Sequence, residues 1–223
     1  MTLLSYHLCR LAMAGRSRRA LQFCYSCWTK LVDVGNPCGD YKARMIATES
    51  HPQTAAPAWP KALYDRLRAA SVRHASYVPD AGHSELIGLL RDDPDMTVNV
   101  LTTEEEGVAI AAGAWLGGGR SVVLMQSSGV GNCINMLSLP VIARFPLLML
   151  VTMRGEWAEF NPWQVPMGSA TEAALQAIGV RTLRASTPDD LLEMCSSALI
   201  EAFEGDQQIA ILISQRMLGV KKW

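Results

Sequence analysis

The sequence predicts an α/β fold with a doubly wound, mostly parallel six-stranded sheet. Apolar strands alternate regularly with helical patterns, the strands are continuous apolar runs, and neither an internal repeat nor a second core is visible. Such strands are typical of a sheet covered by helices on both faces, and right-handed crossovers place any ligand site at the edge where the strands end. We expect one domain at residues 58–216, after an N-terminal extension and linker (1–57) and before a tail (217–223).

The first half of the predicted domain places two strands among three helices. The helices are expected at residues 61–71, 83–93 and 104–119, and the strands at 74–80 and 97–103. Apolar residues of the first helix recur at helical spacing, and Ser84 is the expected N-cap of the second helix.

The second half continues the same alternation. Its strands are expected at residues 120–128, 147–155, 180–186 and 208–214, and its helices at 129–139, 169–179 and 187–205. A long irregular loop is expected at 156–168. Gly179 ends one helix, and Thr187 with Pro188 begins the last one.

The composition excludes two classes of partner. The formal net charge is −1, so no basic field favours nucleic acid. The most apolar stretch, residues 134–151, contains Arg144 between Pro140 and Pro146, which argues against a membrane-spanning helix. No disulfide framework of a secreted protein is recognisable, so a cytoplasmic location is expected.

Residues 1–45 differ in composition from the rest. They contain seven Lys or Arg against two acidic residues, and four of the six cysteines. Cys24 and Cys27 have the spacing of a metal or redox pair, but a second such pair is missing, so two incidental thiols are favoured and no metal site is predicted. Cys133 and Cys195 lie in apolar helical patterns and are expected to be small core residues.

Three adjacent carboxylates, Glu104, Glu105 and Glu106, begin the helix at 104–119. Acidic side chains are favoured there by the helix dipole and by unpaired backbone N–H groups, which by itself accounts for all three. If the strand ends at Thr103, Glu104 lies at the edge of the sheet, whereas Glu105 and Glu106 can turn to solvent. The small residues that follow suit a helix that packs closely against its neighbours.

The glycine-rich turn "MQSSGVGNCIN" (125–135) joins a strand to a helix. Its spacing matches neither common nucleotide-binding pattern, so a generic nucleotide site has weak support. Gln126 and Asn132 belong to a set of polar groups larger than a simple turn needs. The turn alone favours a ligand site and a purely structural role about equally.

Other candidates lie at the same edge. Arg154 ends the most apolar strand, where a solvated position and an anion clamp are comparably favoured. His83 is either a proton carrier or a structural residue near a helix start. Trp157, Phe160 and Trp163 in the long loop either only pack the loop or form a lid or an interface, and the second interpretation is slightly favoured.

Taken together, these stretches resemble a known family. "TTEEEGVAIAAGAWLGGGRSVVLMQSSGVGNCINMLSL", followed by "PLLMLVTMRGEW" and "QVPMG", is similar to the α subunit of sulfopyruvate decarboxylase and to the N-terminal part of phosphonopyruvate decarboxylase. Both are thiamine diphosphate-dependent decarboxylases. The resemblance covers residues 60–216, is strongest over 102–168, and implies the pyrimidine-binding (PYR) domain of the thiamine diphosphate-binding fold.

The resemblance implies a catalytic and cofactor-binding role for Glu104. In the family a glutamate at the end of the second strand meets the aminopyrimidine ring, and the pattern E-x₈-G, counted back from Gly113, places it at Glu104. By the same resemblance, Gln126, Gly129 and Asn132 contact the cofactor. A buried carboxyl bonded to the pyrimidine N1′ suits the proton transfer that activates the cofactor.

The resemblance also implies substrate contacts. Asp80 and His83 match a loop that reaches the substrate in related decarboxylases, and Arg154 is the candidate for the second anionic group of a 2-oxo acid. The sequence departs from the pattern here, because Ala81 stands where phosphonopyruvate decarboxylases have a serine.

In the family, the diphosphate and Mg²⁺ are held by a second domain with a GDG…N motif. No GDG occurs here, and residues 39–41 and 205–207 both break the motif. We therefore expect a β-type partner subunit that carries the diphosphate and most of the Mg²⁺ site, in a hetero-oligomer. The alternatives are the PYR-type subunit of another thiamine diphosphate enzyme and a non-catalytic flavodoxin-like binding module.

Overall fold

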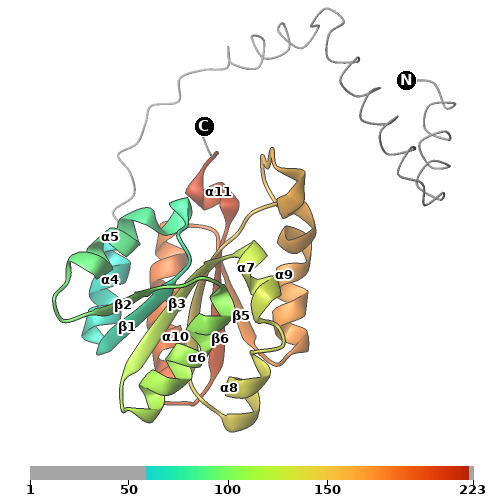
Figure 1. The fold of residues 1–223 in the computed structure, drawn as a ribbon. Coiled ribbons are helices and arrows are strands. Elements are labelled where there is room, and N and C mark those ends of the chain that lie inside the picture. The colour runs from blue at the N-terminus through green and yellow to red at the C-terminus, as the bar shows by residue number, and fades with distance from the viewer. Residues whose placement is uncertain (1–58, 221–223) are drawn as a thin grey trace, which may run out of the picture. The chain divides into compact units, whose positions relative to one another are not determined.

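A computed structural model describes residues 59–220, so the predictions for residues 1–57, including those for Cys24 and Cys27, lie outside the described residues. Six strands form one sheet in the order β2-β1-β3-β4-β6-β5, and every neighbouring pair is parallel (Figure 1). The strands are β1 (Val72–Tyr77), β2 (Thr97–Val100), β3 (Arg120–Gln126), β4 (Leu147–Thr152), β5 (Arg181–Ala185) and β6 (Gln208–Ile213). The predicted doubly wound sheet is confirmed.

Helices cover both faces of this sheet (Figure 1). The helices are α4 (Trp59–Ala69), α5 (Ser84–Asp92), α6 (Glu104–Leu116), α7 (Ser127–Cys133), α8 (Ser138–Ala143), α9 (Val165–Ala177), α10 (Pro188–Phe203) and α11 (Gln215–Leu218), with the short 3₁₀ helices η1 (Ala81–His83) and η2 (Pro162–Gln164). Helices α4, α5 and α10 pack on one face, and α6, α7 and α9 on the other. None of the helices within residues 59–220 combines the length and apolar character needed to cross a bilayer.

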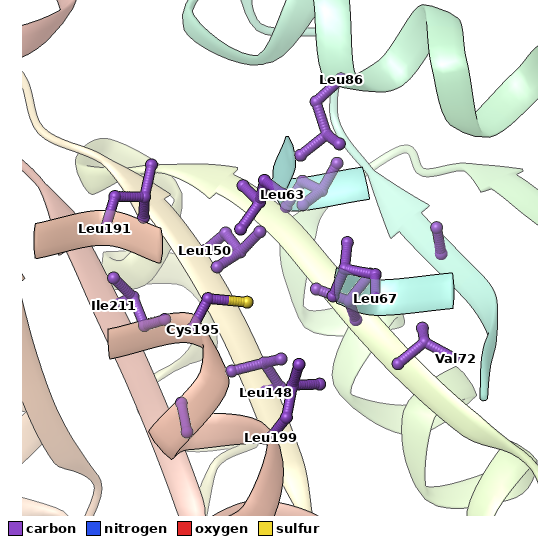
Figure 2. Packing of buried hydrophobic residues seen from close by; sticks show 14 of the residues in the cluster. Leu63, Leu67, Val72, Leu86, Leu148, Leu150, Leu191, Cys195, Leu199 and Ile211 are labelled. Atoms are coloured by element: carbon purple, nitrogen blue, oxygen red, sulfur yellow. The ribbon is translucent and has the colours of Figure 1, made fainter. Parts of the chain in front are cut away.

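The central strands are buried from both sides, as continuous apolar runs predict. Along β4, Leu148 and Leu150 face α4 and α10, whereas Met149 faces α6, α7 and α9, because successive side chains of a strand point to opposite faces. Figure 2 shows Leu63 of α4 and Cys195 of α10 on the same face of the sheet as Leu148 and Leu150. Each large apolar side chain buried in this way contributes about 1.5–3 kcal/mol to folding.

In the first half of the domain, two helix starts differ from the prediction. Helix α4 begins at Trp59, two residues before its expected start at residue 61, with Pro60 in its first turn, where a missing N–H costs nothing. Ser84 is the first residue of α5 rather than its N-cap, because η1 runs directly into the helix through His83. At the other end of the domain, α11 carries Met217 and Leu218 into contact with the core, although the sequence places the domain end at residue 216.

Helix α9 begins at Val165, so the predicted loop at 156–168 is shorter than expected. Pro166 suits the first helical turn. A Cβ on Gly168 would lie 2.1 Å from the backbone oxygen of Arg154. Gly168 therefore lies inside the helix and allows a close backbone approach, whereas the sequence pattern suggests a loop residue.

Helix α6 packs tightly against the sheet next to the acidic cluster. A Cβ on Gly107 would lie 2.8 Å from Val123 Cγ1 and 2.9 Å from Leu101 Cδ1. The predicted close packing of this helix is thus confirmed at Gly107. At Gly113, by contrast, an added Cβ would meet nothing within 4 Å.

Candidate active site at the carboxyl edge of the sheet

Polar side chains from four adjacent strands gather where these strands end. Glu104 follows β2, Asp80 follows β1, Gln126 ends β3, and Thr152 ends β4. The strands are parallel neighbours in the order β2-β1-β3-β4. The predicted edge therefore brings together side chains that are far apart in the sequence.

Glu104 is the buried member of the acidic cluster. Its residue surface is 8% exposed, whereas Glu105 and Glu106 are exposed, which confirms the predicted division of the three carboxylates. Glu106 Oε2 accepts a hydrogen bond from the backbone N–H of Thr102 at 2.9 Å and so satisfies a donor at the helix start. Glu106 thus serves the helix terminus and leaves Glu104 as the candidate for chemistry.

The carboxylate of Glu104 lies against the first turn of α7. Asn132 Nδ2 donates a hydrogen bond to Glu104 Oε2 at 2.9 Å. A Cβ on Gly129 would lie 2.3 Å from Glu104 Oε1, so the side chain of any other residue would collide with the carboxylate. The structure thereby brings together Glu104, Gly129 and Asn132, three of the residues expected to contact a cofactor.

Gln126 belongs to a second polar cluster. Its Nε2 donates to Asp80 Oδ1 at 2.8 Å, and Thr152 Oγ1 donates to Asp80 Oδ2 at 2.6 Å. Ser128 Oγ donates to Gln126 Oε1 at 3.3 Å, which links this cluster to the start of α7. Gln126, expected to contact the cofactor, is thus bound to the expected substrate residue Asp80.

The surroundings of Asp80 keep its carboxyl group ionised. Burial by itself raises the pKa of Asp80, but the adjacent His83 and hydrogen bonds from Thr152, Gln126 and the Gly82 backbone outweigh it and hold the pKa below its ordinary value. Asp80 therefore presents a fixed negative charge at the site edge.

His83 lies inside the protein. It is 1% exposed, and its Nε2 is 3.1 Å from the backbone oxygen of Leu150. Burial lowers the pKa of His83 below its ordinary value, although the charge of Asp80 opposes this shift. Its burial argues against the expected direct contact with substrate, and its observed role is to join η1 to β4.

Arg154 is already paired within the chain. Its Nε and Nη2 donate to the two carboxylate oxygens of Glu159, each at 2.7 Å, and the two side chains are 10% and 3% exposed. Gln215 Nε2 donates to the same carboxylate at 3.0 Å. The expected anion clamp is thus occupied by a loop glutamate, which the turn at Gly155 (φ 78°) brings back onto the strand end.

The pairing of Glu159 predicts an acid-dependent loss of stability. The hydrogen bonds from Arg154 lower the pKa of Glu159 to about 2, against the opposing effect of burial. The ordinary pKa of glutamate is about 4.3, so this contribution is fully present above that pH and is lost as the pH falls toward 2. We expect the Tm of Glu159→Gln to fall less steeply than that of the wild type between about pH 4.5 and 2, measured by circular dichroism; parallel curves would contradict this.

The loop that contains Glu159 exposes aromatic side chains. Trp157, Phe160 and Trp163 are 40%, 48% and 82% exposed. Glu156 ties the base of the loop to α11, since its Oε1 accepts from the backbone N–H of Gln215 at 2.8 Å. The aromatic residues therefore lie on a braced loop, and their role as a lid or interface stays a prediction.

Two clefts open at this edge. One has a volume of about 300 Å³ and lies between Asp80, Thr152 and the end of α11. The other has a volume of about 730 Å³ and lies between α7 and η2, with Asn132 and Trp163 in its walls. Since Asn132 also binds Glu104, the second cleft adjoins the buried carboxylate.

Within residues 59–220, no group of three or more His, Cys, Asp and Glu side chains is arranged to hold a metal ion. Cys133 and Cys195 are free and buried, as predicted. Burial raises the pKa of each thiol to about 12, with a further contribution at Cys133 from the charges of Glu104 and Glu105. Both are therefore unreactive core residues.

Three residues of these networks were not singled out from the sequence. Thr152 carried a usable signal, because it is a polar residue near the end of an apolar strand at the predicted site edge. Glu159 and Gln215 lie 56 positions apart and meet only in the folded chain. No local sequence pattern predicts such a pairing.

Comparisons with known proteins agree with this geometry. The profile of the family described as "Thiamine pyrophosphate enzyme, N-terminal TPP binding domain" matches residues 60–163. A solved 2-oxoglutarate:ferredoxin oxidoreductase from Magnetococcus marinus shares the fold, with a TM-score of 0.59 at 15% identity over 70% of this chain and 28% of that chain.

The curated relatives are decarboxylases. Sulfopyruvate decarboxylase subunit alpha of Methanococcus maripaludis is 32% identical over 69% of this chain and 92% of that protein. The subunit of the same name in Methanocaldococcus jannaschii is 32% identical over 68% and 90%, respectively. Phosphonopyruvate decarboxylase of Streptomyces viridochromogenes is 36% identical over 56% of this chain and 32% of that protein. The chain therefore belongs to the sulfopyruvate decarboxylase α-subunit family of thiamine pyrophosphate enzymes.

Proposed function

We propose that this chain is the pyrimidine-binding subunit of a thiamine diphosphate-dependent 2-oxo acid decarboxylase. Its substrate is sulfopyruvate or phosphonopyruvate, and its products are the corresponding acetaldehyde and CO₂. The observation that carries the proposal is the position of Glu104. Its carboxylate is buried at the carboxyl edge of the sheet, at the place where the family pattern puts the cofactor-activating glutamate.

The residues around Glu104 fit an aminopyrimidine ring. Oε2 is bound to Asn132, and no hydrogen bond to Oε1 is present among residues 59–220, so one carboxyl oxygen is available to a ligand. When bound, thiamine diphosphate supplies the electron-accepting ring that decarboxylation of a 2-oxo acid requires. Glu104 would hold a proton at the pyrimidine N1′, and its burial keeps water from competing for that bond.

Asp80 is the residue of this chain that we place on the substrate side. It lines the smaller cleft and stays ionised beside Thr152 and Gln126. A carboxylate there repels a second carboxylate, which disfavours the charged 2-oxo acid relative to its decarboxylated product. Arg154 is not part of this proposal, because Glu159 already neutralises it.

The proposal includes a β-type partner subunit that holds the diphosphate and Mg²⁺, in a hetero-oligomer. It is supported by the absence of a GDG motif from the sequence and by relatives that are themselves named as α subunits. A cytoplasmic location is part of the proposal, since no disulfide framework of a secreted protein is recognisable in the sequence.

The decisive experiment measures two quantities on the chain, on its partner and on their mixture. The first is the rise in Tm caused by thiamine diphosphate with Mg²⁺, and the second is CO₂ release from sulfopyruvate and from phosphonopyruvate. We expect both to require the mixture. Stabilisation without CO₂ release from either substrate would indicate another thiamine diphosphate enzyme, and no response of either kind would indicate a non-catalytic binding module.

A further inference from the structure

The carboxylate of Glu104 is held by two residues of one helical turn. Gly129 and Asn132 are three positions apart in α7 and therefore lie on the same side of that helix. From this side, Asn132 Nδ2 binds Oε2 at 2.9 Å. A Cβ at Gly129 would lie 2.3, 2.4 and 2.6 Å from Oε1, Cδ and Cγ of Glu104. The acidic side chain thus lies directly against the backbone of α7.

The approach of Glu104 to α7 is fixed from its own helix as well. Gly107, one turn further along α6, lets that helix lie against Val123 and Leu101. Glu106 binds the backbone N–H of Thr102 and fixes the start of the helix. The side chain of Glu104 therefore meets α7 because both helix backbones are held close together.

From these contacts we propose that Gly129 and Asn132 are positioning residues that act on the cofactor through Glu104. This inference rests on the proposed function and assigns the two residues a different role from the direct cofactor contact that the family resemblance implies. Asn132 fixes the rotation of the carboxylate by binding one oxygen, and Gly129 leaves room for the other. Together they keep Oε1 in the single orientation in which it can meet a ligand.

The test uses the full chain assembled with its partner and the variants Gly129→Ala and Asn132→Ala. Gly88→Ala is the matched control, because a Cβ at Gly88 in α5 meets nothing within 4 Å. A misplacement of about 1 Å costs on the order of 100-fold in rate. We therefore expect Gly129→Ala to lower kcat by about 100-fold, with little change in the Kd for thiamine diphosphate and no change in Gly88→Ala.

Two further readouts separate positioning from direct contact. In crystals of the cofactor-free chain, Glu104 should rotate away from α7 in Gly129→Ala, and the side-chain amide resonances of Asn132 should shift in Glu104→Gln. The double variant Gly129→Ala/Glu104→Gln should be no slower than Glu104→Gln alone, because both changes remove the same interaction. Asn132→Ala provides the same comparison if Gly129→Ala does not fold.

The outcomes distinguish this inference from the proposed function. If Glu104 keeps its position in both Gly129→Ala and Asn132→Ala, or if the effects of the double variant multiply, the positioning role is overturned. If Glu104 moves as expected but the assembled chain and partner release no CO₂ from either substrate, the positioning of Glu104 stands and the proposed function fails.

Discussion

Replacing Glu104 with glutamine in the assembled enzyme is expected to lower kcat by about 10²- to 10⁴-fold, the range that a positioned acid–base group contributes. Glutamine keeps the shape of the side chain and its contact with Asn132 but cannot hold a titratable proton. Because the change takes a charge out of a buried position, the fold should be retained. The measurement is the rate of CO₂ release at saturating thiamine diphosphate.

Glu105→Gln is the matched control. Glu105 lies in the same helical turn and is exposed, so this change removes the same charge from the N-terminus of α6. Its expected cost is the helix-dipole contribution alone, about 0.3–1 kcal/mol of stability, with kcat unchanged. Equal activity in Glu104→Gln and Glu105→Gln would refute the catalytic assignment.

Replacing Arg154 with methionine is expected to destabilise the chain by about 3–5 kcal/mol, because it leaves the buried carboxylate of Glu159 without its counter-charge. The side chain of Glu159 is 3% exposed and receives two hydrogen bonds from Arg154. The remaining donors, among them Gln215, place the effect toward the lower end of that range. Urea denaturation at pH 7 measures the loss.

The double variant Arg154→Met/Glu159→Gln should recover most of this stability, since neither charge then remains unpaired. Comparing Arg154→Met with the double variant decides whether Arg154 binds the substrate or only forms a structural ion pair with Glu159. A substrate clamp would show itself as a raised KM with little loss of stability. A structural ion pair gives the large stability loss and its recovery in the double variant.

The sequence predicted the arrangement that brings the site together, because parallel strands always end at a common edge. It also separated Glu104 from Glu105 and Glu106, although β2 ends at Val100 and not at Thr103, where the prediction placed its end. It placed the start of α9 too late, because a glycine such as Gly168 looks the same in a loop and in a tightly packed helix. Only the contact with the backbone of Arg154 distinguishes the two.

The interaction partners of the side chains were harder to predict from the sequence than the positions of the residues in the fold. Arg154 and His83 both lie at the expected edge, yet Glu159 pairs with the first and burial removes the second from solvent. Gln126 is bound to Asp80 rather than beside Glu104. A charge in a sequence shows no partner, and the partner decides whether that charge is available to a ligand.

By itself, the sequence determined the parallel sheet and its common edge, which follow from periodicity and chain direction, both local properties. The family resemblance carried by the sequence then selected Glu104 at that edge. The tertiary structure alone decided that Gly129 and Asn132 hold that glutamate and that Glu159 occupies Arg154. Such contacts form between segments that meet only when the chain folds. Changes of a few tenths of an ångström in their separation decide whether a contact is possible, because close packing leaves no room for a single extra carbon atom.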